Sequence, residues 1–448
     1  MIDKLKPYPQ YKASGVEWLG EVPEDWDVVP LCSFASPKSI PNQEDRELLS
    51  VYLNRGVIKF SDVKEKRTNV TSEDLSKYQA VDPGDFVLNN QQAWRGSVGV
   101  SEYSGIVSPA YLVLKLGPRI DTNYANWFFR EQSMVVQYLI ASKGVGSIQR
   151  NLYWPHLKRV STLLPPIKEQ QAIAEFLAFA NRRISKAIRL KKKMIKLLEE
   201  EKQAIIHQAV IGQIDVRTGE PYPAYKESGV EWLGMVPEEW EVRRLKTISK
   251  MKSGFGITTL SIEDSGEFPV YGGNGIRGYA SDYTHDGDFA LIGRQGALCG
   301  NVHLAHGKFW ASEHAVVATL YSKFSLEWFS YLLDVMNLNQ YSIAAAQPGL
   351  AVDRIINLWA PVPPYDTQAL ICKEMNQAAQ RIDKAINPLK NEIDLLNEYR
   401  TRLIADVVTG KLDVREAAAA LPAEDADDVG DVEMEEAEFI EQEDGTDG

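Results

Sequence analysis

Apolar residues recur at alternating spacings of four and three along two long stretches of the chain. On this spacing, eight of ten positions are apolar in the first stretch, Ile173–Ile205, and nine of ten are apolar in the second, Ile371–Leu403. An apolar pattern that persists over about five heptads is typical of coiled-coil packing rather than of an ordinary surface helix. We therefore expect two long helices that pack through these faces.

The ends of both helices are marked in the sequence. A proline pair precedes each helix, at residues 165–166 and 363–364, and Gly212 and Gly410 follow them. Proline disfavours a helical backbone conformation for the residue that precedes it, and glycine is common just past the end of a helix. Helices of about 40 residues are on the order of 60 Å long. Antiparallel pairing within one chain would relate its two halves by a pseudo-twofold axis and place the segments outside the helices at opposite ends of the pair. The alternative is a parallel coiled coil between two copies of the chain.

The chain is a tandem duplication. The string YKASGVEWLGEVPEDW at Tyr11–Trp26 returns as YKESGVEWLGMVPEEW at Tyr225–Trp240, an offset of 214 residues. Residues Gln149–Arg217 align without a gap on Gln347–Arg415 at an offset of 198. The segment between the matched blocks is therefore 16 residues shorter in the second copy.

The segments between the matched blocks have diverged, but each is large enough to form a domain. Both share a skeleton, with PGDFVLN at Pro83 matched to DGDFALI at Asp286, and strand patterns precede a helix pattern. The alternation at Tyr111–Leu114 predicts a half-buried strand, and the spacing over Trp127–Leu139 predicts an amphipathic helix. The fold class that follows is α+β, with two mixed α/β domains joined by two long helices packed as an antiparallel coiled coil.

Polar, glycine-rich runs lie between the strand patterns and predict loops: NNQQAWRGSVG, YGGNGIRGY and GRQGALCG. Asn and Gln can form paired hydrogen bonds with adenine and Arg with guanine, so such loops can read base edges. A plain polar turn is the alternative for any single residue. The candidate DNA-binding residues are Asn89, Asn90, Gln91, Gln92, Arg95, Gln149 and Arg150 in the first copy, and Asn274, Arg277, Arg294, Gln295 and Gln347 in the second.

The formal net charge of −13 comes from one end of the chain. Residues 421–448 hold thirteen acidic and no basic residues, which leaves 49 acidic against 49 basic residues elsewhere. So acidic a segment, poor in apolar residues, is expected to be disordered and to aid solubility, although it could also mimic DNA and mask a basic groove. No apolar run or leading signal indicates a membrane or export, and the three cysteines show no paired spacing. We expect a cytoplasmic protein.

Motifs for catalysis are weak. The glycines in YGGNGIRGY spell GxGxxG, but a strand pattern follows where a dinucleotide site needs a helix. The VPPY string at Val362 has valine where a DNA methyltransferase needs Asn or Asp. His303, His306 and His314, with Cys299 nearby, leave a zinc site open, although polar surface or core is the commoner role of such residues. We expect neither catalytic residues, nor a metal, nor a cofactor in this chain.

The order of these strings resembles the DNA-specificity (S) subunit of type I restriction-modification systems. The resemblance rests on YKxSGVEWLGxVPExW, YGGNGIxGY, GRQG, GSIQRNL and LPPIKEQQAIAEFL, and extends from Tyr8 to about Arg415. The second copy departs from it, with VPPYDTQ for LPPIKEQ and AAAQPGL for GSIQRNL.

This resemblance implies a non-catalytic subunit in which each of two target-recognition domains reads half of a bipartite, gapped site in double-stranded DNA. The helices would set the gap and dock two methyltransferase (M) subunits, and restriction (R) subunits would join them. S-adenosylmethionine would then belong to the M subunits and ATP with Mg to the R subunits. The rival hypotheses are an interaction protein that works through its coiled coil, and a fused methyltransferase or nuclease.

The implied organisation has five parts. The first target-recognition domain with its leading segment covers residues 1–163, and the first helical spacer covers 164–217. The second target-recognition domain with its leading segment covers 218–361, and the second spacer covers 362–415. Residues 416–448 form the acidic tail.

Overall fold

The computed structural model describes residues 5–53, 55–63, 74–145, 149–296, 298–342 and 349–422. The chain divides into two compact units. The first unit contains the chain up to Leu190 together with the part from Asn391 onward, and the second contains Lys191–Lys390. Gln347 and the acidic residues from 423 to the end lie outside the described residues. In the described part of the chain, no helix combines the length and apolar character that crossing a membrane requires.

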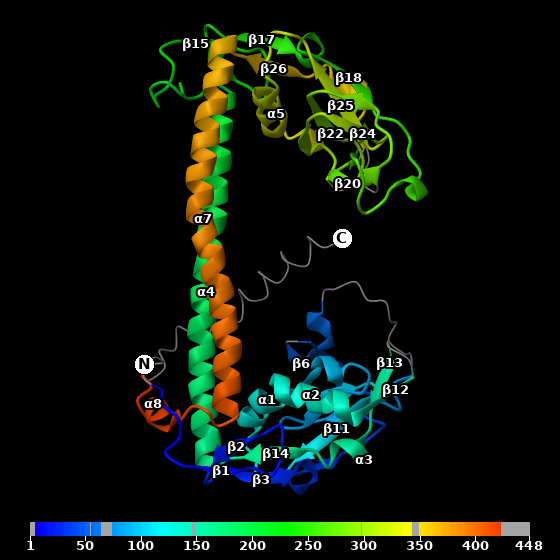
Figure 1. Cartoon of the computed structure of the whole chain (residues 1–448), viewed down its shortest axis with the longest axis vertical. Coiled ribbons are helices and arrows are strands. Elements are labelled where there is room, and N and C mark those ends of the chain that lie inside the picture. The colour runs from blue at the N-terminus through cyan, green and yellow to red at the C-terminus, as the bar shows by residue number, and fades with distance from the viewer. Residues whose placement is uncertain are drawn as a thin grey trace. The chain divides into compact units, whose positions relative to one another are not determined.

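Two helices of 44 residues each, α4 (Ile167–Val210) and α7 (Tyr365–Val408), confirm the long helices predicted from the heptad pattern. In the first unit, the beginning of α4 shares a core with the end of α7, through residues that include Ile173 and Leu403. In the second unit, the end of α4 shares a core with the beginning of α7, through residues that include Ile206 and Ile371. The pairing is therefore antiparallel, as predicted (Figure 1).

The predicted helix ends are also confirmed, because both helices stop just before a glycine in the left-handed region. Gly212 has φ +79° and Gly410 has φ +78°, a conformation that costs glycine little. A Cβ atom on Gly410 would also lie 2.5 Å from the ring of Pro23, so this position excludes larger residues on two grounds. Within α7, the helix continues through Pro388, which lacks the N–H for one helical hydrogen bond.

We call residues 27–164 of the first unit the first mixed domain. Its main sheet is antiparallel, in the order β4 (Ala35–Pro37), β11 (Tyr111–Leu116), β8 (Phe86–Asn89) and β9 (Val98–Val100). Two-stranded pairs surround it: β3–β14 (Asp27–Pro30, Ser161–Leu164), β5–β6 (Leu49–Tyr52, Gly56–Lys59), β7–β10 (Gln79–Val81, Gly105–Val107) and β12–β13 (Ser142–Val145, Gln149–Leu152). Short helical segments complete it: η2 (Leu31–Ser33), η3 (Phe60–Asp62), η4 (Ala93–Arg95) and α3 (Trp154–Leu157).

The single amphipathic helix predicted after these strands is wrong, because the structure has two. Helix α1 (Thr122–Arg130) and helix α2 (Gln132–Ala141) are separated by Glu131, whose backbone is extended. The Glu131 carboxylate accepts a hydrogen bond of 2.7 Å from the N–H of Ser133 and so caps the start of α2. The periodic apolar residues run across the break, so periodicity alone could not reveal it.

Residues 241–362 of the second unit form the second mixed domain. Its main sheet has the order β18 (Ser249–Ser253), β25 (Ala315–Leu320), β22 (Phe289–Gly293) and β23 (Val302–Ala305), which repeats that of the first. A second sheet has the order β20 (Gly275–Ala280), β19 (Phe268–Gly272), β24 (Lys308–Ala311) and β21 (His285–Asp286). The other elements are β17–β26 (Glu241–Arg244, Trp359–Val362), α5 (Leu326–Val335), α6 (Val352–Ile355), η5 (Leu245–Thr247), η6 (Thr259–Ser261) and η7 (Leu338–Tyr341).

The repeated SGVEWLG string connects the strands of a small hairpin in each unit, β1–β2 (Tyr11–Ala13, Glu21–Pro23) and β15–β16 (Tyr225–Glu227, Met235–Pro237). Each hairpin leads into a fully buried tryptophan, Trp26 or Trp240. In the first unit the segment that leads into β1 meets the segment that follows α7, since the N–H of Asp413 donates to the carbonyl of Lys6 at 2.8 Å. Helix α8 (Arg415–Ala419) follows, so the segment assigned to the tail begins within a helix.

Candidate nucleic-acid interface

The predicted loop of the first mixed domain is a tight turn after β8. The Asn89 side chain accepts a hydrogen bond of 3.1 Å from the N–H of Gln91, so this amide shapes the turn. Trp94 Nε1 donates to the carbonyl of Gln91 at 2.9 Å, and the Arg95 guanidinium lies 4.7 Å from the Trp94 ring centre. Gln91, Gln92 and Arg95 are exposed. The turn therefore presents three hydrogen-bonding side chains on a backbone held by its own bonds.

Asn90 lies at the centre of this arrangement. Its N–H donates to the carbonyl of Ala110, at 3.3 Å, and its carbonyl accepts from the N–H of Leu152, at 2.9 Å. Its side-chain oxygen is buried and has no hydrogen-bond partner among the described residues. Leu152 belongs to β13, so these bonds hold the β12–β13 hairpin against the turn.

The hairpin brings the two remaining first-copy candidates close to the turn. Gln149 pairs through its backbone with Val145, and Arg150, which is half-buried, pairs with Gly144. The structure therefore gathers the first-copy candidates around one turn and one hairpin strand.

In the second mixed domain, the predicted loop YGGNGIRGY is instead a hairpin. Gly272 pairs with Gly275 across a two-residue turn, so Arg277 lies on strand β20 and the loop prediction is wrong for it. The loop prediction failed because glycines usually mark loops, whereas the glycines of this segment lie in or beside paired strands and permit close packing of those strands. Asn274 is at the turn itself, exposed, and its side-chain oxygen accepts from Asn301 Nδ2 at 2.8 Å.

Arg294 and Gln295 follow β22 in a turn that lies next to this hairpin. A Cβ atom on Gly293 would lie 2.0 Å from the Gly273 carbonyl oxygen, so only glycine permits the approach. The exposed Gln295 side chain lies 2.8 Å from His314 Nδ1, and Arg294 is half-buried. The structure thus brings Asn274, Arg294 and Gln295 together, whereas Gln347 lies outside the described residues.

The same two backbone bonds hold both turns. The Arg294 N–H donates to the carbonyl of His314 at 2.8 Å, and the Arg294 carbonyl accepts from the N–H of Leu350 at 2.9 Å. Asn90 makes the same two bonds, with the carbonyl of Ala110 and the N–H of Leu152. Arg294 is therefore the structural counterpart of Asn90, an offset of 204 residues. Matching the GDF strings gives an offset of 203 and would pair Arg294 with Gln91. That match is wrong by one residue here, because the pairing of β8 and β22 with the central strands fixes the register.

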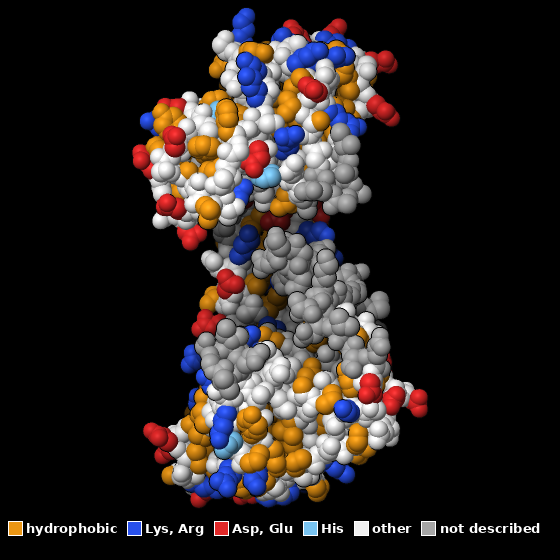
Figure 2. All heavy atoms as spheres, turned by 90° about the vertical axis from the view of Figure 1, so that its right-hand side faces the viewer, with side chains coloured by type: hydrophobic (Ala, Val, Ile, Leu, Met, Phe, Trp, Pro, Cys, Tyr) orange, Lys and Arg blue, Asp and Glu red, His pale blue; other side chains and the backbone are white. Residues whose placement is uncertain are grey.

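Charge is mixed on both units. On the face that Figure 2 draws, basic, acidic and apolar side chains are interspersed over the described surface. Burial lowers the pKa of His303, which favours its neutral form. His306 faces Asp288 at 2.8 Å, whereas His314 faces Gln295. Among the residues that the structure describes, no three His, Cys, Asp or Glu side chains form a group that could hold a metal ion.

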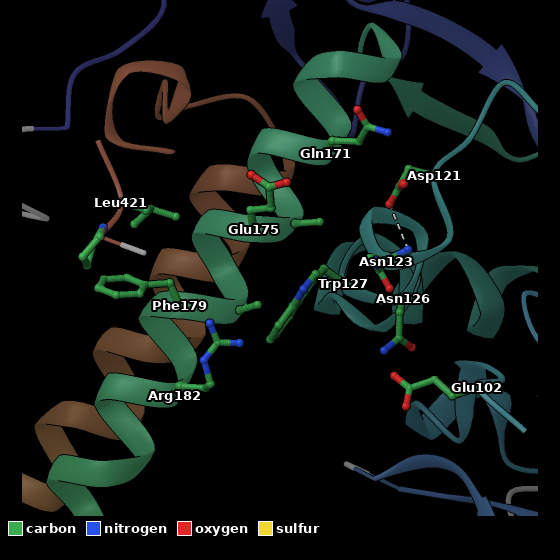
Figure 3. Close-up of a pocket in the computed structure, with 13 residues that line it drawn as sticks. Glu102, Asp121, Asn123, Asn126, Trp127, Gln171, Glu175, Phe179, Arg182 and Leu421 are labelled. Atoms are coloured by element: carbon green, nitrogen blue, oxygen red, sulfur yellow. Dashed lines mark hydrogen bonds between the residues drawn. The ribbon is translucent and has the colours of Figure 1, made fainter. Parts of the chain in front are cut away.

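A cleft of about 740 Å³ separates α1 from α4 in the first unit. Figure 3 shows Trp127 extending from α1 toward α4, where Arg182 lies. Ala174 and Ala178 also line it, and their small side chains leave the space open. In the second unit Asn376 stands 198 residues after Ala178 and accepts a hydrogen bond of 2.8 Å from the Tyr331 hydroxyl. The two mixed domains thus meet their long helices differently.

Residues 237–395 match the family model described as the type I restriction modification DNA specificity domain. Over 137 residues the chain is 45% identical to the EcoprrI specificity subunit of Escherichia coli, covering 30% of this chain and 34% of that protein. This chain is a homologue of type I restriction-modification specificity subunits. The MjaVIII specificity subunit of Methanocaldococcus jannaschii is 20% identical over 429 residues, which cover 88% of this chain and 94% of that subunit.

Other specificity subunits agree with this relationship over shorter lengths. A subunit from Haemophilus influenzae is 31% identical over 116 residues, covering 25% of this chain and 30% of that protein. The chain therefore aligns with about a third of the length of the E. coli and H. influenzae relatives. A solved structure described as the basis of complex assembly and conformational transition of the type I R-M system matches with a TM-score of 0.66 and 15% identity. It covers 87% of this chain and 99% of that one, and it supports the fold.

Proposed function

We propose that this specificity-subunit homologue recognises a bipartite, gapped site in double-stranded DNA, and that each mixed domain reads one half. The observation that carries the proposal is the shared position of Asn90 and Arg294 on turns held by the same backbone bonds. Asn pairs best with adenine and Arg with guanine. A shared scaffold that carries different residues at one position suits two domains that read different half-sites. To contact a base, the Asn90 amide would have to turn out of its buried position.

The remaining candidates divide by exposure. Six of them are exposed and suit contacts with base edges or phosphates: Gln91, Gln92, Arg95, Asn274, Arg277 and Gln295. Arg95 lies against Trp94, which restricts its side chain before DNA arrives and so reduces the entropy lost on binding. Asn89, Gln149, Arg150 and Gln347 complete the proposed set.

The long helices act in this proposal as a spacer between target-recognition domains at 1–163 and 218–361. Their residues, 164–217 and 362–415, set the gap and dock two methyltransferase subunits, and restriction subunits complete the complex. Methyl transfer and DNA cleavage belong to these partners, with S-adenosylmethionine in the former and ATP with Mg in the latter. The chain itself binds no cofactor or metal and works in the cytoplasm.

The first test is to co-express the full chain with the adenine methyltransferase subunit of its own system and to sequence host DNA for N6-methyladenine. The proposal predicts one split motif methylated on both strands, which also supplies both half-sites. A stable complex that methylates no split motif would refute DNA recognition and favour an interaction protein. Binding to the motif should weaken steeply with salt, because phosphate contacts release counterions.

A further inference from the structure

Gln170 is a fully buried amide near the start of α4. Its Oε1 accepts a hydrogen bond from the N–H of Asp121 at 2.7 Å. Its Nε2 donates to the carbonyls of Arg119, at 3.0 Å, and Pro165, at 2.7 Å. One side chain of the long helix therefore binds three backbone groups, two of which belong to the segment that leads into α1.

The bond to Asp121 holds the start of α1 in place. Asp121 is the N-cap of α1, and its carboxylate accepts from the N–H groups of Asn123 and Tyr124, both at 3.0 Å. The apolar core that α1 and α4 share favours burial without fixing an angle, whereas hydrogen bonds are directional. The Gln170 amide thus orients the first mixed domain on its long helix.

The second copy repeats this device. Gln368 stands 198 residues after Gln170 and is 1% exposed. Its Oε1 accepts from the N–H of Ser325 at 2.9 Å, and its Nε2 donates to the carbonyl of Pro363 at 3.0 Å. Ser325 is the N-cap of α5, as Asp121 is of α1. The diverged domains have kept the same attachment although their cap residues differ.

The copies differ in what supports this attachment. In the second unit, Asn376 of α7 bonds to both Tyr331 and Glu327 of α5, which gives a further polar tie. In the first unit, the cleft lined by Trp127 and Ala178 lies between the corresponding helices (Figure 3). Ala178 cannot form the hydrogen bonds that Asn376 makes at the corresponding position of the second unit.

We propose that Gln170 and Gln368 are positioning residues, which fix the angle of each mixed domain on its long helix and so determine which gap between half-sites is accepted. The proposal rests on the proposed function, because the gap has meaning only if each domain reads half of a DNA site. Neither glutamine is expected to touch DNA, since both side chains are buried.

The test uses the full chain in complex with its methyltransferase subunit. Gln170→Met and Gln368→Met keep the length of the side chain and remove its hydrogen bonds. Gln171→Met is the matched control, since Gln171 is exposed and adjacent. Methylation is measured on DNA with the native gap and with gaps one base pair shorter or longer.

We expect Gln170→Met to reduce the preference for the native gap roughly tenfold, since loss of about 1.4 kcal/mol changes an equilibrium by that factor. Gln368→Met should reduce it less, and Gln171→Met should leave it unchanged. If methylation falls in the same proportion at all gap lengths, the glutamines only stabilise the fold and the proposal is wrong.

Hydrogen exchange separates this inference from the proposed function. In Gln170→Met, the amides of Asp121–Tyr124 should exchange faster while those of β8 and β11 keep their protection. Unchanged exchange at Asp121 would overturn the proposal whatever the DNA results. If the wild-type complex methylates no split motif, the proposed function fails, and faster exchange at Asp121 would still support the orienting role of Gln170.

Discussion

Removing the carboxylate of Glu169 should destabilise the first unit, because two buried donors depend on it. The Tyr8 hydroxyl donates to Glu169 Oε1 at 2.6 Å, and Trp26 Nε1 donates to the same oxygen at 2.9 Å. Glu169 and Tyr8 are each 6% exposed, and Trp26 is fully buried. Burial raises the pKa of Tyr8, so its hydroxyl remains a donor throughout the neutral range.

The magnitude follows from these two bonds. A hydrogen bond to a charged group contributes about 1.5–3 kcal/mol, so two contribute about 3–6 kcal/mol. Removing a buried carboxylate also removes its desolvation cost, which offsets part of this sum. We expect Glu169→Ala to lower the free energy of unfolding by about 2–4 kcal/mol and Glu169→Gln by roughly half as much.

The second copy supplies the reverse experiment. Thr367 stands where the first copy has Glu169, and neither Tyr222 Oη nor Trp240 Nε1 has a hydrogen-bond partner among the described residues. The rings of Tyr222 and Trp240 lie 5.7 Å apart, as those of Tyr8 and Trp26 do. Thr367→Glu would offer both donors an acceptor and should stabilise the second unit by about 1 kcal/mol.

Urea denaturation of the full chain measures these changes, and hydrogen exchange at Trp26 and Trp240 assigns each to its unit. Glu169→Ala should raise exchange around Trp26 and leave Trp240 unaffected. The reasoning is refuted if Glu169→Ala lies within about 0.5 kcal/mol of wild type, the range of an ordinary surface substitution.

Three further predictions follow from the fold and the proposed function. Arg294→Ala should weaken recognition of one half-site by about 1–3 kcal/mol, and equal weakening with every base at that half-site would show a phosphate contact instead. Deleting one heptad from each long helix, 187–193 and 385–391, removes about 10 Å of helix and should shorten the methylated gap, so an unchanged gap would exclude a spacer. Lys38→Met should lower the free energy of unfolding in urea by about 2–4 kcal/mol, because the buried Asp85 loses its cation and Asp82 loses the Lys38 ammonium at 2.7 Å. A smaller decrease in the free energy of unfolding would contradict this prediction. Lys38, together with Arg46, lowers the pKa of Asp82, so the part of this stability that Asp82 contributes is present above about pH 4 and lost as the pH falls further, and the variant should show a weaker loss in acid.

The parts of the fold that depend on local pattern could be predicted from the sequence. Heptad spacing and flanking Pro and Gly residues gave the long helices, since these signals act within one helix. Other features depend on spatial neighbours that the sequence does not place. They are the capping role of Glu131, the strand position of Arg277 and the match of Asn90 to Arg294. Register is decided by pairing across the sheet, and one residue of slip changes which side chain is presented.

The buried glutamines had a signal that the sequence analysis missed. Gln170 lies three residues before Ile173, on the apolar face of the first helix, and Gln368 lies three residues before Ile371. A polar residue on an apolar face is costly unless it is hydrogen-bonded. The presence of glutamine at the same position in both copies therefore indicated that each side chain has a specific hydrogen-bond partner.

The division of the chain into units also has a consequence for its synthesis. The second unit is one continuous stretch, whereas the core of the first unit needs Leu403 and Val407 from the far end of the chain. At about 5–20 residues per second, these arrive roughly 10–40 s after residue 190 has been made. Until then the apolar face around Ile173 and Leu177 lacks its partner helix. The ribosome therefore completes the second unit before the first, and the nascent first half is the stage at which this protein is most exposed to aggregation or to capture by a chaperone.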